Sequence, residues 1–240
     1  ISTNTQKIVL SFALLITMLN FFLIFNIFNK KIVLNNHRED LYIFLLALFF
    51  ILIIYFNNFD LLNVIISIFS SLSNSGISLI ENERNLSLFF LFITIIGGSL
   101  ISNSSGIKLS RFYILIKITS SEIIKLVSPN SVINKTIFSA ENKITDENVR
   151  ISFLIFISFF CSLFILSSFL VLDDIGFENS FKLSILTLTN TVNSNMYGIQ
   201  NLNFVNLLIS SKISLIIFMI IGKIELISFF LIFRKILIKD

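Results

Sequence analysis

Apolar residues in this chain form long runs separated by short polar stretches. The runs at 8–28, 41–56 and 151–172 are long enough, or nearly so, to cross a bilayer as helices. The runs at 61–72 and 181–188 are not, because twelve residues rise only about 18 Å as a helix and the hydrocarbon core is about 30 Å thick. The pattern predicts that these two short helices enter the membrane without crossing it. Further apolar runs cover 86–101, 107–118 and 204–238, the last broken at 210–212 and 222–225.

A polar turn with a glycine follows each short run. The first turn contains Ser73, Asn74, Ser75, Gly76 and Ile77, and the second contains Asn193, Ser194, Asn195, Met196, Tyr197 and Gly198. Glycine reaches positive φ without steric penalty, so successive carbonyl groups in such a turn can face one axis and replace an ion's hydration shell. The pattern favours two re-entrant pore loops whose turns form an ion filter. The alternative is a pair of ordinary extracellular turns.

The order long helix, short helix, polar turn, long helix occurs twice. Gly97 corresponds to Gly222 at an offset of 125 residues and Gly76 to Gly198 at an offset of 122, which predicts an insertion of three residues. This repeat divides the chain into a closing transmembrane helix (1–29), a cytoplasmic loop (30–40), a pore-loop repeat (41–118), a second cytoplasmic loop (119–150) and a second pore-loop repeat (151–240).

Composition places the chain among all-α polytopic membrane proteins. It is 55% hydrophobic and only 13% charged, whereas soluble domains are about one quarter charged. No Cys/His cluster, phosphate-binding glycine loop or paired nucleophile and base is present, so we expect neither an enzyme nor a covalent cofactor. We expect Cys161 to be a small buried hydrophobe and His37 to be solvated. The chain begins at Ile1 rather than Met, which suggests a fragment.

Basic residues predict the orientation. Thirteen of the 18 lie on one side of the predicted spans: Lys30, Lys31, Arg38, Lys108, Arg111, Lys117, Lys125, Lys135, Lys143, Arg150, Arg234, Lys235 and Lys239. The positive-inside rule makes this side, with the C-terminus, cytoplasmic. The opposite loops are acidic and would concentrate cations outside both turns. They carry Asp60, Glu81, Glu83, Asp173, Asp174 and Glu178. The net charge of +4 thus reflects topology, and we expect no nucleic-acid partner.

Two further polar features interrupt apolar runs. The first is a mid-span loop with Gly97, Gly98, Ser99, Ser102, Asn103, Ser104, Ser105 and Gly106. Irregular backbone at this depth is tolerated only against protein or a water-filled cavity, so this loop is either a gate or a simple helix kink or end. The second is the pair Lys223 and Glu225, which do not share a helix face: we expect Lys223 to project into the cavity and Glu225 into a helix contact, and the alternative is that both pair with other helices for stability.

These motifs resemble those of Trk-type potassium uptake proteins, the TrkH/KtrB family of the Trk/Ktr/HKT superfamily. The stretch 97–111, GGSLISNSSGIKLSR, is similar to the family's GG-x-x-GST-x-GGIK-x-x-R, and 222–226, GKIEL, is similar to its GRLEL segment. The stretch 73–77 stands where the family has a TTTGF-like filter turn. The resemblance covers nearly the whole chain but only the C-terminal half of the family, with 41–118 and 151–235 as its third and fourth repeats.

The resemblance implies a pseudo-fourfold pore that takes up potassium across a bacterial-type inner membrane. It implies potassium ions at Ser75, Gly76, Asn195 and Tyr197 and a gating loop at 99–105. It also implies that the positively charged residue Lys223 faces this loop under the filter. It also implies a homodimer and a cytosolic nucleotide-binding regulatory subunit. Because two turns supply half of such a filter, either the native chain is longer or two chains assemble.

Departures from the family pattern leave alternatives open. The family's fourth turn reads near GNVGPG, and here either Tyr197 or Gly198 takes its filter position. Lys223 keeps the charge of the family's arginine without its rigid fork. The prediction is potassium uptake; the alternatives are a sodium or sodium/potassium conductor of the same fold, and a non-conducting membrane scaffold or remnant.

Overall fold

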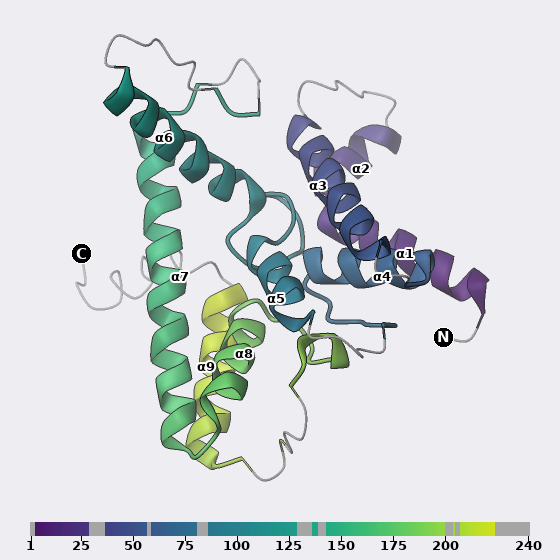
Figure 1. Ribbon diagram of the computed structural model, residues 1–240, viewed down its shortest axis with the longest axis vertical. Coiled ribbons are helices and arrows are strands. Elements are labelled where there is room, and N and C mark those ends of the chain that lie inside the picture. The colour runs from purple at the N-terminus through teal and green to yellow at the C-terminus, as the bar shows by residue number, and fades with distance from the viewer. Residues whose placement is uncertain are drawn as a thin grey trace.

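Helices make up the computed structural model, which describes residues 3–28, 37–56, 59–80, 86–128, 136–138, 143–199, 204 and 207–223 (Figure 1). The predicted all-helical fold class is confirmed for these residues. A 3-10 turn, η2, covers Asn195–Tyr197. In chain order the α-helices are α1 (Asn4–Met18), α2 (Phe21–Phe28), α3 (Arg38–Tyr55), α4 (Leu61–Leu72), α5 (Ser87–Ile96), α6 (Leu109–Val127), α7 (Asp146–Leu172), α8 (Phe177–Leu188) and α9 (Ile209–Lys223).

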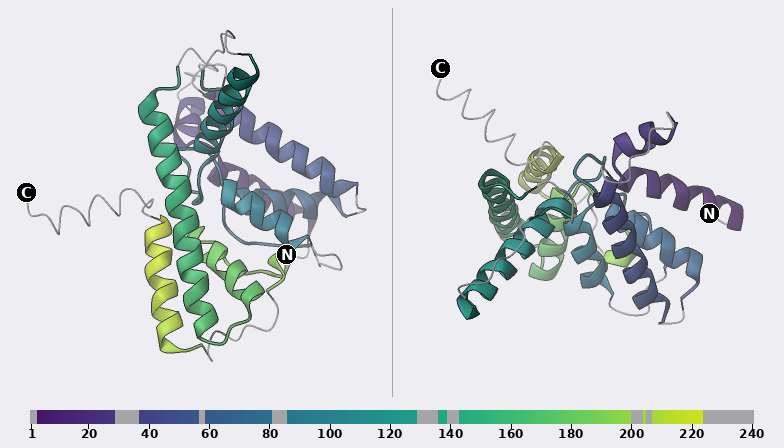
Figure 2. Two further views of the ribbon diagram at one scale, coloured as in Figure 1. Left: turned by 60° about the vertical axis from the view of Figure 1, so that its left-hand side comes forward. Right: turned by 90° about the horizontal axis from the view of Figure 1, so that it is seen from above.

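Two units of similar design stand beside each other, α3–α4–α5 and α7–α8–α9 (Figures 1 and 2). In each unit the short middle helix packs against both of its neighbours. Helix α4 has the predicted bounds, 61–72, and α8 begins four residues earlier than predicted, at Phe177. The earlier start follows from an acidic first turn, because Glu178 complements the positive end of the helix dipole.

The predicted span at 8–28 is wrong as a single helix. The chain breaks between Met18 and Phe21, where the Asn20 side chain accepts a hydrogen bond from the Phe22 amide (2.9 Å). Loop residues pair with the freed backbone groups: Ser99 N–H donates to the Met18 carbonyl (3.0 Å), and Phe21 N–H donates to the carbonyl of Ile101 (3.1 Å). A break within an apolar run is tolerable because these groups are satisfied internally.

Other helix bounds also differ from the sequence pattern. Helix α6 continues to Val127, and α7 begins at Asp146 behind a Thr145 cap, so both enter the predicted cytoplasmic loop 119–150. The expected break at 210–212 is absent from α9, which starts at Ile209 and contains these residues. Within the described residues, α7 alone is both long and apolar enough to span a membrane by itself.

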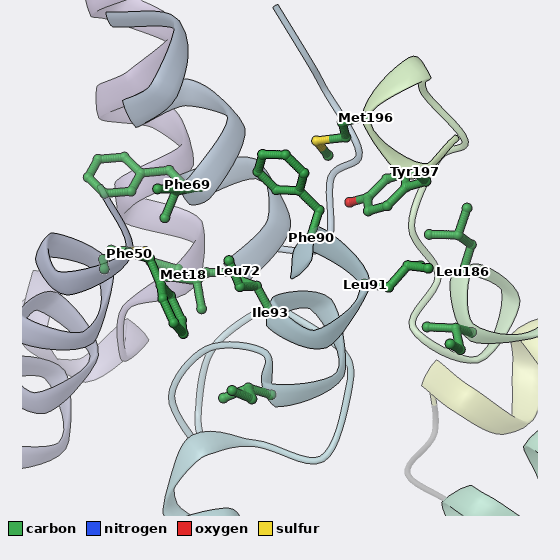
Figure 3. Close-up of a cluster of buried hydrophobic side chains, with 14 of the residues drawn as sticks. Met18, Phe50, Phe69, Leu72, Phe90, Leu91, Ile93, Leu186, Met196 and Tyr197 are labelled. Carbon is green, nitrogen blue, oxygen red and sulfur yellow. The ribbon is translucent and has the colours of Figure 1, made fainter. Parts of the chain in front are cut away.

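The core lies where the two units meet. Figure 3 shows Phe90 and Leu91 of α5 beside Met196 and Tyr197 of η2, all of which are buried. Large apolar side chains elsewhere are exposed on α3 and α7, among them Phe49 and Phe153. Such a surface suits contact with lipid chains. Cys161 lies exposed on α7, contrary to the expectation that it is buried.

Candidate functional site

The first turn, residues 73–76, continues from the end of α4. The Ser75 amide donates to the Ser70 carbonyl (3.0 Å), and the hydroxyls of Ser73 and Ser75 lie 2.8 Å apart. Asn74 takes a left-handed conformation with φ 58°, which asparagine tolerates better than most residues. Gly76 also has a positive φ, 76°, and a Cβ added to it would lie 2.0 Å from the Val192 carbonyl oxygen. Glycine is therefore needed at position 76.

A second turn of the same design, residues 189–192, continues from the end of α8. Here Thr191 N–H donates to the Leu186 carbonyl (2.8 Å), and the hydroxyls of Thr189 and Thr191 lie 2.8 Å apart. Asn190 has a φ of 53°, close to that of Asn74. The structural counterpart of Gly76 is thus Val192, whose φ is not positive.

Two asparagine hydrogen bonds establish the register of the repeat. Asn74 Nδ2 donates to the Thr94 carbonyl in α5, and Asn190 Nδ2 donates to the Met219 carbonyl in α9, each at 2.9 Å. Thr94 and Met219 are 125 residues apart, which is the offset predicted from Gly97 and Gly222. The asparagines are 116 apart, so the insertion comprises nine residues rather than three. The predicted match of Gly76 with Gly198 is wrong in this register. The residues that correspond in the two turns are the left-handed Asn74 and Asn190, which are 116 residues apart.

The predicted second filter segment, residues 193–198, follows the second turn. It contains Asn193, Ser194, Asn195, Met196, Tyr197 and Gly198. Met196 and Tyr197 are fully buried in the core (Figure 3), and Ser71 Oγ of α4 lies 3.9 Å from Met196 Sδ. Tyr197 ends the 3-10 turn, whereas Gly198 has a left-handed φ of 66°. Of these two filter candidates, Gly198 alone has the backbone conformation expected of a filter glycine.

Four backbone carbonyl groups in the two turns have no hydrogen-bond donor among the described residues. Within the described part of the chain, no hydrogen bond ends on the carbonyl oxygens of Ser75 and Gly76, nor on those of Thr191 and Val192. The buried side-chain oxygen Oδ1 of Asn74 is likewise without a donor among the described residues. A buried acceptor such as Asn74 Oδ1 normally has a partner, and cations or water are the partners that suit it and the carbonyl groups of the turns.

The loop 97–106 is non-helical, as its glycines predicted. Gly97 and Gly106 have positive φ, and the Gly98 amide donates to Ser104 Oγ (2.9 Å). The hydroxyls of Ser102 and Ser104 lie 2.6 Å apart, and Lys108 Nζ contacts the Ser104 carbonyl. Although it interrupts a helix at membrane depth, the loop is held by its own side chains and by the break at Met18–Phe21.

Two carboxylates at the start of α3 hold this loop and the break between α1 and α2. Glu39 Oε1 accepts a hydrogen bond from the Leu100 amide (2.8 Å), and Asp40 Oδ1 accepts one from the Asn20 amide (2.8 Å). His37 is buried, contrary to the expectation that it is solvated, and its Nδ1 lies 3.3 Å from Asp40 Oδ2. Local sequence patterns do not predict these contacts, because the partners of Glu39 and Asp40 are backbone groups distant along the chain.

One cavity of about 270 Å³ brings together the first turn, the loop 97–106 and Lys223, whereas none of the residues 193–198 lines it. Lys223 Nζ donates to the Asn103 carbonyl (3.0 Å) at this cavity. Glu225 lies outside the described residues. The cavity wall also includes the uncharged Thr17 and Asn190, which the sequence analysis missed; the asparagine shared by both turns was the available signal. The lining residues are Ala13, Leu14, Thr17, Ser73, Asn74, Ser75, Asn103, Ser105, Asn190 and Lys223.

Comparison with known proteins gives the fold a precedent. The chain matches no protein-family model and no curated protein sequence. Its structure is similar to the crystal structure of the potassium transporter TrkH from Vibrio parahaemolyticus, with a TM-score of 0.82 and 19% sequence identity. The match covers 97% of this chain and 52% of the transporter, so the chain spans about half the length of that protein. The fold implied by the sequence resemblance is confirmed.

Proposed function

We propose that this chain forms half of a potassium-conducting pore, with the turns at 73–76 and 189–192 as two parts of the ion filter. The observation that carries this proposal is the single cavity shared by the first turn, Asn190, the loop 97–106 and Lys223. An ion leaving the turns enters this cavity, and the loop is its floor. The fold of the potassium transporter TrkH supports the same arrangement.

The chemistry of the turns suits a dehydrated monovalent cation. The carbonyl oxygens of Ser75, Gly76, Thr191 and Val192 accept no hydrogen bond from the described part of the chain and are available to replace waters of hydration. Asn74 and Asn190 fix the turns to α5 and α9 through their side-chain amides, so the carbonyl groups are held before an ion arrives. Acidic residues at the outer mouth, including Asp60, Asp173 and Asp174, raise the local cation concentration.

The loop 97–106 is the gate in this proposal, and Lys223 is its latch. Lys223 Nζ holds the loop from α9 through the Asn103 carbonyl, while Glu39 holds it from α3 through the Leu100 amide. Movement of the loop out of the cavity must break at least the first of these bonds. Charge at membrane depth is expensive and usually functional, which favours this role for Lys223 over a purely stabilising one.

Assembly and cellular context complete the proposal. A four-part filter needs two more turns. In this proposal the present residues are the C-terminal half of a longer pore, and the N-terminal half supplies the other two turns. We further propose a homodimer, a cytosolic nucleotide-binding regulatory subunit and a place in a bacterial-type inner membrane with the C-terminus inside. Potassium is the transported ion rather than a resident cofactor.

A sodium/potassium conductor is the second candidate function. Val192 stands where the first turn has Gly76, and its φ is not positive. Its carbonyl group therefore points differently from that of a left-handed glycine, and a filter with one altered part discriminates less sharply between cations of different size.

Rubidium uptake into proteoliposomes tests the proposal. The full reading frame that contains this segment is reconstituted, with potassium and sodium as competitors. Uptake blocked by potassium and little affected by sodium is expected, and equal block by both ions would favour the second candidate. No uptake by folded protein, with its cytosolic regulator added, would favour a membrane scaffold and refute conduction.

A further inference from the structure

Helix α8 carries a buried lysine behind the second turn. Lys182 is 5% exposed, and its Nζ lies 2.5 Å from Glu178 Oε1, one helical turn earlier. The Glu178 side chain is 80% exposed, so the pair runs from the solvent-facing end of α8 into the protein. A lysine ammonium is seldom buried unless it is paired, and a flexible lysine would reach solvent more cheaply by pointing outward.

The ammonium group also reaches the segment 193–198. Lys182 Nζ lies 3.4 Å from the Gly198 carbonyl oxygen, within hydrogen-bonding distance. A Cβ at Gly198 would be 3.3 Å from this nitrogen and 3.2 Å from Ser87 Cβ at the start of α5. Gly198 is thus fitted between α5 and the lysine, and Lys182 ties the pore helix to the end of the segment.

The first unit shows that the fold itself does not require a lysine here. At the turn offset of 116 residues, the counterpart of Lys182 is Ile66, which is fully buried, and the counterpart of Glu178 is Leu62. Between the turn asparagine and its hydrogen-bond partner in the following helix, the second unit has nine residues more than the first. The ion pair therefore accompanies the longer segment, which needs an anchor that the first unit lacks.

Displacement of this segment would reach both turns. Residues 193–198 start directly after Val192, and the Val192 backbone lies against Gly76 closely enough to exclude a Cβ there. Met196 and Tyr197 are buried in the core. The segment is therefore held at its middle by apolar packing and at its end by Lys182.

We propose that Lys182 is a positioning residue that fixes the segment 193–198 and thereby sets the ion specificity of the adjoining turns. This inference rests on the proposed function, because specificity has meaning only if ions pass the turns. Lys182 contacts no transported ion in this account. It acts through the Gly198 carbonyl, and the ion pair with Glu178 orients its ammonium group.

The test compares Lys182→Met, which keeps the length and removes the charge, with Lys182→Arg, which keeps the charge. Lys125→Met is the matched control, because Lys125 forms an exposed ion pair with Glu122 on α6, away from the turns. Each variant of the full reading frame is reconstituted for competition of rubidium uptake by sodium and potassium. Hydrogen exchange of residues 193–199 is followed by mass spectrometry on the same samples.

Lys182→Met is expected to lower the preference for potassium over sodium by about tenfold, because the segment loses one charge-assisted hydrogen bond. Hydrogen exchange in residues 193–199 should also become faster. Lys182→Arg should restore most of both properties, and Lys125→Met should change neither. Wild-type preference in a conducting Lys182→Met protein, or unchanged exchange in its segment, would overturn the inference alone. Absence of uptake by the unsubstituted protein would instead overturn the proposed function.

Discussion

The two units of this protein share a backbone design but differ in the residues that complete it. In both, a twelve-residue helix ends in a turn whose left-handed asparagine donates to a carbonyl of the following helix. The first unit then has Gly76 in its turn and a helix broken after Ile96. The second has Val192 in its turn and an α9 that continues to Lys223.

This difference separates the residues that both units need for their structure from the residues that differ between the units. The asparagine and its hydrogen bond are present in both units and define the turn. The broken helix occurs in the first unit, where it provides the loop under the cavity, and the intramembrane lysine occurs in the second, where it holds that loop. The proposed gate and latch therefore come from equivalent positions of opposite units, since Gly98 corresponds to Lys223 at the offset of 125.

The largest expected effect comes from filling the contact between the turns. Gly76→Asp should abolish selective rubidium uptake, because a side chain there meets the Val192 carbonyl and a left-handed φ adds about 1–3 kcal/mol of strain. Uptake and the amount of protein in the membrane are measured together. Gly176→Ala is the control, since its Cβ would meet no atom within 4 Å. Potassium-selective uptake by Gly76→Asp would refute the filter assignment.

Removing the latch should have the next largest effect. Lys223→Met breaks the bond to the Asn103 carbonyl and should raise the rate of rubidium uptake by up to about tenfold, with the same preference for potassium. Lys223→Arg retains a donor and should behave as the unsubstituted protein. A Lys223→Met protein that conducts no faster would show that this lysine does not restrain the loop.

The shared asparagines predict a smaller, graded loss of stability. Asn74→Ala should lower the free energy of unfolding by about 1–3 kcal/mol, as the loss of a buried hydrogen bond does, and Asn190→Ala by about 0.5–1.5 kcal/mol because its hydrogen bond is exposed. Asn74→Ala should lower it more, because Asn74 is buried and also bonds to Thr191 Oγ1 (3.4 Å). Denaturation in detergent measures both. Glycine variants separate the hydrogen bond from the left-handed backbone, and a larger loss at Asn190 would contradict the ranking.

The smallest effect concerns pH at the outer end of α8. The hydrogen bond and charge of Lys182 lower the pKa of Glu178 below its ordinary value of 4.5. A lowered pKa means that the pair stabilises the protein above about pH 4.5 and that this contribution is lost as the pH falls through the folded-state pKa. The difference in Tm between the unsubstituted protein and Glu178→Gln should therefore be present at neutral pH and vanish in acid. A difference that persists in strong acid would contradict this assignment.

Sequence patterns predicted the features that depend on local periodicity and length. The bounds of α4 follow from an apolar run flanked by Asp60 and Ser73, and the relation of α5 to α9 follows from Gly97 and Gly222. The non-helical loop 97–106 follows from glycines that tolerate positive φ.

Features that depend on distant partners were not predictable in the same way. The sequence pattern predicts the second turn at residues 193–198, whereas it lies at 189–192. The pattern depends on a glycine, but here Asn190 takes the left-handed conformation. The break after Met18 depends on amide and carbonyl partners in the loop, about 80 residues along the chain, which no local pattern encodes. The sequence pattern does not single out Lys182, because a lone lysine in a short helix is typical of a solvated residue. Its burial is evident only in the structure.

Anomalous scattering from rubidium in crystals of the full-length protein tests the central claim most directly, because it locates the ion against the backbone. The account predicts density beside the carbonyl groups of Ser75, Gly76, Thr191 and Val192, directly above the cavity lined by Lys223. Density confined to Asn195 and Tyr197, or found away from both turns in a protein that takes up rubidium, would contradict it.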